Sequence, residues 1–422
     1  MGQTLRRRQA GADPFGTVQS LEHMAALKKE QSDYAAARAI LQETLAAKRR
    51  LLGNGDPEVA KTLNQLGETV ALAGSLRQAE ALHQEALSIA RQAEGPQGVT
   101  VAESLLALAS RAERRGDYPQ AETYHRQGFA ILSRAWGEDD PRLAEEQAVL
   151  AEVLIDQGKL REAEAFLTPA LAAQRKALGD EHPHVSRLFE LLATIRGQLG
   201  DYRGAEALYR QALAGLLRHY GEQTKRTADV IASLGASLKH QGRYEEAAAL
   251  LERSLAIRRR ILGDRHEEVG HSLLHLAECR RKLGQPEAAL TLARQSLSTL
   301  ETTLGREHPY VAYPLQAIAL VLRDQGRTAA AERHFRRALE LLSRSVPAGH
   351  PQIASAKVEL VGCLITLERP DEALRLLRDA EPILAATFGP GSPKGAQGPG
   401  AARNARARRQ RLKGGRELRP PR

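Results

Sequence analysis

The feature that most constrains the fold of this chain is a repeat of 42 residues. Nine turn-like positions recur at this interval along the 422-residue sequence, with no insertion or deletion between them. Such a period is typical of a repeat array, in which each unit packs only on its neighbours and no single central core is needed. The turn positions, each taken as position 0 of its repeat, are Ser32, Gly74, Gly116, Gly158, Gly200, Gly242, Gly284, Gly326 and Glu368.

Two further positions keep this register and predict two packed helices in each repeat. Position −8 is large and apolar throughout, and the next position is Ala or Gly in all repeats but the last, which has Val361. Position +5 is Ala in all nine repeats, from Ala37 to Ala373. A large side chain beside a small one lets two helices interlock closely. The residues at position −8 are Met24, Leu66, Leu108, Leu150, Leu192, Leu234, Leu276, Ile318 and Leu360.

The joints between repeats carry a second punctuation, a Gly followed four residues later by Pro. Gly just past a helix end supplies a left-handed cap, and Pro is tolerated at the first position of the next helix. The joint at Glu94–Gly98 keeps the Gly but lacks the Pro in register, so we expect it to be weaker than the others. The Pro residues in register are Pro57, Pro141, Pro183, Pro309 and Pro351.

The net charge of +10 is concentrated outside the repeats. Residues 389–422 carry ten Lys and Arg residues against Glu417, in a stretch rich in Gly and Pro, and are predicted to be a disordered basic tail. Residues 1–16 are predicted to be a short, partly disordered basic extension, and residues 17–388 form the repeat array. Because the repeats are nearly neutral, the basic pI does not by itself indicate a nucleic-acid-binding fold.

The sequence shows no sign of catalysis, of a cofactor or of a metal site. No phosphate-binding loop or nucleophile motif is present, and Asp139 and Asp140 in a joint are explained by helix capping. His271 and His275 are four residues apart, as metal ligands on a helix are, but no third ligand accompanies them. We therefore expect no enzyme activity, no bound metal and no small-molecule substrate.

The two cysteines indicate the compartment. Cys279 and Cys363 occupy the same register two repeats apart, so stacked helices would place them about 20 Å from each other. A disulfide needs Cα atoms within about 7 Å, so both are predicted to be free thiols in a reducing, cytoplasmic environment. No apolar run is long enough to span a membrane, and the first residues lack the apolar stretch of a secretory signal.

The turn Gly, the Leu–Ala pair before it and the Ala after it resemble the tetratricopeptide repeat. The 42-residue period and the Leu-Gly-x-x-His/Asp-Pro joints resemble the longer subtype found in kinesin light chain and nephrocystin-3-like proteins. The resemblance covers about residues 17–388. It implies an all-α, right-handed α-solenoid of nine helix-turn-helix repeats. It also implies a non-catalytic protein that binds partner peptides on its concave face, which the first helix of each repeat lines.

On that face, basic residues recur at position −3 in three consecutive repeats. A groove that tolerates like charges at this spacing suits an acidic peptide or a carboxylate. The alternative is a set of helix ends neutralised by local acidic residues such as Glu278. Asn64 is the one residue that matches the groove asparagines of kinesin light chain, whereas Leu106, Ala148, Ala232 and Leu274 do not. The candidate groove residues are Asn64, Lys239, His240, Arg281, Lys282 and Arg323.

Acidic residues occupy this face in the earlier repeats, which would give the groove oppositely charged ends and orient a bound segment. They are Glu68, Glu113, Glu152, Asp156 and Glu190. The favoured hypothesis is a scaffold that binds a peptide segment, acidic segments included. A second hypothesis is a regulatory or sensory module of a signalling or motor assembly. A third is an adaptor that contacts nucleic acid or anionic membrane weakly through the basic tail.

Overall fold

The computed structural model describes residues 14–347, 349–388, 402–408 and 410, and within them all regular structure is helical. The predicted N-terminal extension and the predicted disordered tail therefore lie largely outside the described residues. No described helix combines the length and the apolar character needed to cross a membrane. The chain divides into two compact units, residues 1–201 and 202–422, which are treated separately.

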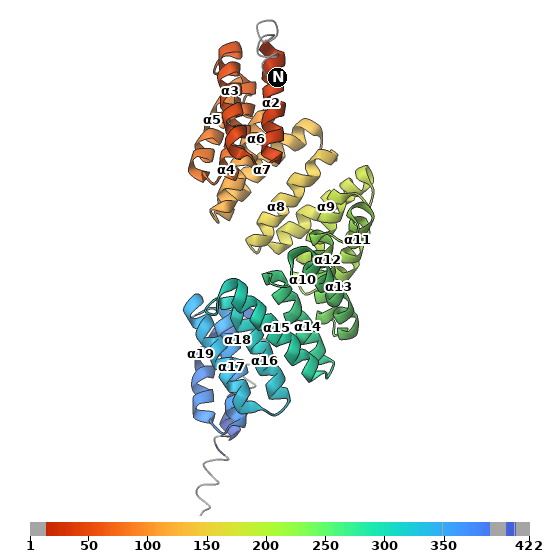
Figure 1. Ribbon diagram of the computed structural model, residues 1–422, viewed down its shortest axis with the longest axis vertical. Helices are drawn as coiled ribbons and strands as arrows, with labels where there is room; N and C mark the ends of the chain where they lie inside the picture. Colours follow the sequence, from red (N-terminus) through yellow and green to blue (C-terminus); the bar gives the residue numbers. More distant parts are fainter. Residues whose placement is uncertain (1–13, 348, 389–401, 409, 411–422) are drawn as a thin grey trace, which may run out of the picture. The chain divides into compact units, whose positions relative to one another are not determined.

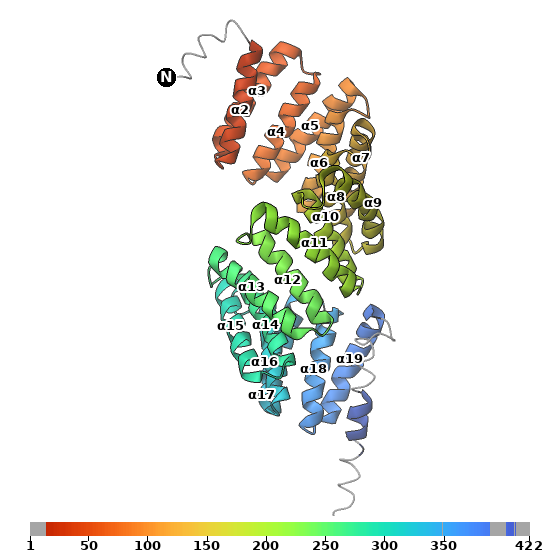
Figure 2. The same cartoon turned by 90° about the vertical axis from the view of Figure 1, so that its right-hand side faces the viewer.

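In the first unit, each helix packs on the next one along the chain, as the repeat register predicts. Figures 1 and 2 show α3 and α4, and likewise α5 and α6, as neighbouring helices. This nearest-neighbour stacking is typical of an α-solenoid. The elements are α2 (Pro14–Glu30), α3 (Tyr34–Leu52), α4 (Pro57–Leu72), α5 (Leu76–Glu94), α6 (Val99–Arg114), α7 (Tyr118–Trp136), the 3-10 helix η1 (Pro141–Leu143), α8 (Ala144–Asp156), α9 (Leu160–Leu178) and α10 (Pro183–Gln198).

The second unit repeats the same arrangement from α11 onward. Its helices also pack in chain order, and Figure 2 shows α13 to α16 side by side. The elements are α11 (Tyr202–Tyr220), α12 (Lys225–His240), α13 (Tyr244–Leu262), α14 (Glu267–Lys282), α15 (Pro286–Leu304), the 3-10 helix η2 (Pro309–Val311), α16 (Ala312–Asp324), α17 (Thr328–Ser345), α18 (Pro351–Thr366) and α19 (Pro370–Phe388).

The register positions behave as the sequence predicts. All nine turn residues adopt a positive φ angle, including Ser32 at 58° and Glu368 at 59°, where no Gly is present. The Ala at position +5 is completely buried in every repeat. A larger side chain at that position would push the two helices of the hairpin apart, because neighbouring atoms leave no room for it.

The joints contain caps that the sequence analysis did not assign. His182, His266, His308 and His350 each use the ring nitrogen Nδ1 to accept a hydrogen bond from the backbone N–H two residues later. At the joint predicted to be weak, Glu94 accepts bonds from the backbone N–H and the hydroxyl of Thr100, at 3.0 and 2.7 Å. Glu94 thus supplies, from the preceding helix, the cap that this joint lacks.

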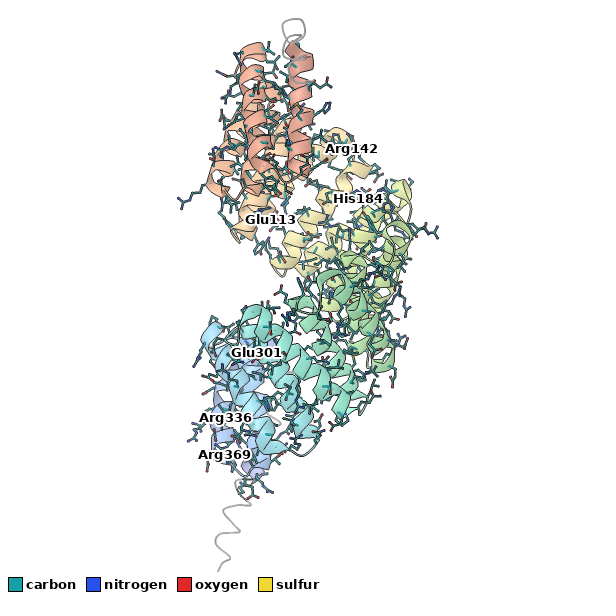
Figure 3. The ribbon with its side chains drawn as sticks, in the orientation of Figure 1. Glu113, Arg142, His184, Glu301, Arg336 and Arg369 are labelled. Carbon is teal, nitrogen blue, oxygen red and sulfur yellow. The ribbon has the colours of Figure 1, made fainter. Side chains whose placement is uncertain are left out.

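A recurrent ion-pair cluster, here called the Glu clasp, ties neighbouring hairpins together on the surface. A Glu at position +6 binds a basic residue one turn later in its own helix and a basic residue just past the next turn. In the last clasp, Arg336 and Arg369 meet at Glu332, and Figure 3 labels both arginines. In the part of the chain that the structure describes, the three clasps are Glu122 with Arg126 and Lys159, Glu206 with Arg210 and Arg243, and Glu332 with Arg336 and Arg369.

Residues 402–408 differ from the disorder predicted for residues 389–422, because they are helical. Ala402 and Ala405 are buried, with 6% and 0% of their surface exposed, and belong to the apolar cluster formed by the last hairpins. The sequence Ala-Ala-Arg-Asn-Ala-Arg-Ala-Arg is rich in strong helix formers, which composition-based reasoning about a basic tail overlooked. For the rest of the tail, disorder stays a prediction.

Candidate partner-binding surface

The predicted basic ladder lies on the first helices of three hairpins in the second unit, and each of its members is paired. Lys239 donates to Glu278 at 2.6 Å. Arg281 binds Asp324 at 2.7 Å, and Arg323 binds Glu359 at 2.7 Å. Each pair joins the first helix of one repeat to the first helix of the next. The ladder is therefore neutralised within the protein, as the alternative interpretation with Glu278 expected.

The remaining predicted groove residues, His240, Lys282 and Asn64, have different surroundings. The ring of His240 stacks on Tyr202 with centroids 4.6 Å apart, whereas Lys282 is exposed. Asn64 uses its amide inside the protein: Nδ2 donates to Ser104 at 2.9 Å, and Oδ1 lies 3.2 Å from Nδ1 of His83. Asn64 thus links α4 to α5 and α6. Asn64 lies in the first unit, whereas the ladder, His240 and Lys282 lie in the second.

An aromatic patch, which the sequence analysis did not predict, lies beside the ladder. It consists of His271, His308, Tyr310 and Tyr313. The ring of Tyr310 lies 5.3 Å from His271, 5.1 Å from His308 and 6.1 Å from Tyr313, measured between centroids. Tyr310 remains 45% exposed at the centre of this patch. The hydroxyl of Tyr313 accepts a bond of 2.6 Å from Gln352, which fixes the edge of the patch.

The patch and the ladder are continuous along α14. His275 follows His271 by one helical turn, and its Nδ1 lies 3.4 Å from Nζ of Lys239. We use the term first-helix face for the surface made by the aromatic patch, His275, Lys239, Arg281 and Arg323. This face combines exposed aromatic area with arginine side chains, and both are enriched at protein-binding surfaces.

The two histidines that resembled metal ligands have other contacts. His271 packs its ring against Tyr310, and His275 lies beside Lys239. Within the described residues, no group of three or more His, Cys, Asp and Glu side chains is arranged to hold a metal ion. Cys279 and Cys363 are free, as predicted; both are also buried, and burial raises the pKa of each thiol to about 11. Both thiols therefore stay protonated at neutral pH.

A buried polar junction lies between the second and third hairpins of the first unit. His83 is 1% exposed, and its ring sits so close to Gly67 that a Cβ there would lie 2.5 Å from the ring. Burial, and then the nearby charge of Arg111, lower the pKa of His83 to about 4, so this ring is neutral at pH 7. Arg111 itself is only 9% exposed, and burial lowers its pKa.

The next hairpin, α6–α7, also buries a histidine, His125. The His125 ring, 2% exposed, lies 2.7 Å from Glu113 through Nε2 and 3.9 Å from Glu146 through Nδ1. Burial raises the pKa of Glu146. Glu113, in the last turn of α6, is labelled in Figure 3. One of the predicted acidic groove residues is thus held by a buried histidine of its own hairpin.

Two other predicted acidic residues of the first unit are also paired. Glu68 binds Lys29 at 2.9 Å, and Glu152 binds Arg187 at 2.9 Å, whereas Asp156 is exposed. These pairs again link adjacent first helices. The idea of a groove with oppositely charged ends stays a prediction, because both the acidic and the basic sets are largely neutralised by internal partners.

The sequence contained a signal for the polar junction that went unused. Position +9 is apolar or tyrosine in seven repeats, where it contributes to the hairpin core, and histidine in two. Comparing the repeats at that position would have identified His83 and His125 as exceptions. The residues at this position are Leu41, His83, His125, Leu167, Tyr209, Leu251, Ala293, Phe335 and Leu377.

Comparison with known proteins supports the repeat assignment. The tetratricopeptide repeat family matches residues 16–92, 58–134, 146–218, 226–302 and 311–386. No curated protein sequence matches the chain. The apo form of the quorum sensor NprR from B. thuringiensis is similar in structure, with a TM-score of 0.64 and 14% identity over 88% of this chain and 99% of that one.

Two further solved structures are similar. The apo form of RapI has a TM-score of 0.61 and 14% identity, over 94% of this chain and 99% of that one. Repeats of a putative kinesin light chain from Podosopora anserina are 24% identical, with a TM-score of 0.43, over 49% of this chain and 97% of that one. At these identities the likeness concerns the fold alone.

Proposed function

The chain belongs to the tetratricopeptide repeat family, and from this premise we propose that it is a non-catalytic scaffold that binds a protein segment on its first-helix face. The observation that carries the proposal is the aromatic patch with Tyr310 at its centre. A tyrosine that is 45% exposed and packed on three other rings is rigid, apolar and able to donate a hydrogen bond. Side chains of this kind supply much of the binding energy at protein interfaces.

The ladder next to the patch favours an acidic segment. Among the described residues, Lys239 forms an ion pair with Glu278 and Arg281 forms one with Asp324. Because Glu278 and Asp324 are 45% and 44% exposed, a carboxylate of the partner segment can compete with them for the same cation. The exposed Lys282 adds positive charge beside Arg281. Binding would then exchange internal ion pairs for intermolecular ones.

A peptide selection on the full chain tests this proposal. Peptides are selected from a random library, and their Kd values are then measured by fluorescence anisotropy for the parent and for Tyr310→Ala. We expect Tyr310→Ala to weaken binding at least about tenfold, because truncation removes an interface anchor. Replacing Lys239, Arg281 and Arg323 together by Glu should weaken the binding of acidic peptides without loss of helicity, which circular dichroism checks.

Tyr220→Ala is the matched control for this experiment. Tyr220 lies in the same unit and is 47% exposed, but it ends a second helix, α11, instead of lying on the first-helix face. Its removal should leave peptide binding unchanged. If Tyr310→Ala and Tyr220→Ala bind the selected peptides as well as the parent does, the first-helix face is not the binding surface.

Two secondary proposals accompany the scaffold. We place the protein in the cytoplasm, which the two free, buried thiols support. A weak contact of the basic tail with nucleic acid or anionic membrane is tested by salt-dependent binding with and without residues 389–422.

The alternative to a passive scaffold is a regulatory or sensory module. A change in solution scattering on addition of the selected peptide would favour that alternative.

A further inference from the structure

In each unit, the first helix of a repeat packs on the hairpin before it. Among the described residues, the last full hairpin, α18–α19, is followed by no further full repeat. Apolar residues of α18 are nevertheless buried. Leu360, Cys363 and Leu364 of α18 are no more than 1% exposed. They belong to an apolar cluster that also contains Ala402 and Ala405, from beyond the last full repeat. The short helix of residues 402–408, dark blue in Figure 2, lies close to this hairpin.

The sequence of this stretch continues the 42-residue register. Gly389 stands where the joints carry their glycine, and Ser392 and Pro393 stand where His350 and Pro351 cap and open α18. Ala402 and Ala405 lie 42 residues after Leu360 and Cys363. The two buried alanines therefore occupy two of the register positions at which the first helix of a repeat contributes to the core.

The burial pattern of the helix is one-sided, as expected for a helix docked on an apolar surface. Ala402 and Ala405 are buried, whereas Arg403, Asn404 and Arg406 are exposed. At its end, Arg408 donates a hydrogen bond to Glu368, the turn residue of the last full repeat. Glu368 has a φ angle of 59°, where seven other repeats use Gly, so this contact gives the carboxylate a role at a costly backbone position.

We propose that residues 402–408 are the first helix of an incomplete tenth repeat, and that they close the end of the α18–α19 hairpin. A helix of this length is not stable alone in water, so its order depends on docking. The docked contact is made by two alanines where α18 has Leu360 and Cys363, so it is weaker than the contact of a full repeat. A partner or a second copy that stacks on this end must displace it.

Hydrogen exchange on the full chain tests the proposal. Ala405→Arg places a long charged side chain in the docked face, whereas Ala407→Arg places the same side chain at an exposed position of the same helix. Both changes preserve helix propensity and add one positive charge. We expect amides of residues 402–408 to exchange at least about tenfold faster in Ala405→Arg than in the parent, and at the parental rate in Ala407→Arg.

Exchange in α2 to α10 provides the check that both variants fold. Equal exchange of residues 402–408 in the two variants, or no protection of these amides in the parent, would overturn the proposal. In that case the end of the α18–α19 hairpin is open to other occupants, such as a second copy of the chain.

Discussion

At the scale of the residue, the turn position shows how backbone conformation selects the amino acid. All nine turn residues have a positive φ angle, a conformation that costs an ordinary L-residue about 1–2 kcal/mol and costs Gly nothing. Seven repeats use Gly there, and the first and last repeats use Ser32 and Glu368. Glu368 is explained by its contact with Arg408. Nothing in the structure explains Ser32.

We therefore expect Ser32→Gly to stabilise the first unit by about 0.5–1 kcal/mol, because the relief of backbone strain exceeds the added chain entropy. Gly158→Ala should destabilise it by about 1–2 kcal/mol. At Gly158 the φ angle is 72° and no atom lies within 4 Å of a new Cβ, so the effect is purely conformational. Urea unfolding followed by circular dichroism measures both changes.

Gly55→Ala is the control, because Gly55 is equally open but does not have a positive φ angle. It should not destabilise the protein. Equal effects of Gly55→Ala and Gly158→Ala would show that the turn conformation in solution differs from the one described.

The Glu clasp predicts a dependence of stability on pH. Burial alone would raise the pKa of Glu122, but hydrogen bonds from Lys159, Arg126 and Gln157 outweigh it and lower the pKa to about 2. Because the folded-state pKa lies below the ordinary value of 4.5, the clasp stabilises the fold above that pH. Its contribution is lost as the pH falls from about 4.5 toward 2.

Glu122→Gln should lower the free energy of unfolding by about 1–2 kcal/mol at neutral pH, and this difference from the parent should shrink on acidification. The control is Glu162→Gln, since Glu162 also binds Arg126 but its side chain is 50% exposed. That change should cost little at any pH. A difference between parent and Glu122→Gln that does not vary with pH would contradict the assigned role of the carboxylate.

At the scale of the element, the helices depend on caps that come from unusual residue types. A neutral imidazole can accept a hydrogen bond through Nδ1, and four joints use His in this way where others use Asp56 or Asp140. The Pro that follows in most joints removes one N–H that would otherwise lack a partner. The joint sequence therefore sets where each first helix begins.

His266 offers a test, since its Nδ1 accepts from the N–H of Glu268 at 3.2 Å and no Pro follows it. His266→Ala should destabilise the second unit by about 1 kcal/mol through loss of the cap. His266→Asp should retain the stability of the parent, because a carboxylate accepts the same bond and suits the positive end of the helix dipole. Thermal unfolding measures both variants, and equal losses would argue against capping.

At the scale of the whole molecule, stability is distributed along the chain instead of residing in one core. Within each unit, the described helices pack mainly on the helices next to them in the chain, so a hairpin with a polar interior can be accommodated if its neighbours adapt. The junction around His83 and Arg111 is an example, because Gly67 makes room for the His83 ring and Asn64 binds it.

This architecture predicts a gradient of hydrogen-exchange protection within the first unit. Among the described residues α2 is the first helix, it packs mainly on α3, and Leu27 within it is 57% exposed. Amides of α2 and α3 should therefore exchange through local opening at lower free energy than amides of α4 to α7. Native-state exchange in low denaturant measures this, and uniform protection across α2 to α7 would indicate one cooperative unit instead.

The sequence by itself determined the helices, the turns, the joints and the small-residue packing positions, because these depend on local conformation and on a register that recurs nine times. It did not determine which charges pair, that the ring of Tyr310 packs against those of His271, His308 and Tyr313, or that residues 402–408 are helical. Those features depend on side chains about one repeat apart in sequence, whose directions are set only when hairpins stack. Periodicity identifies the equivalent positions, and the stacked structure decides which atoms meet.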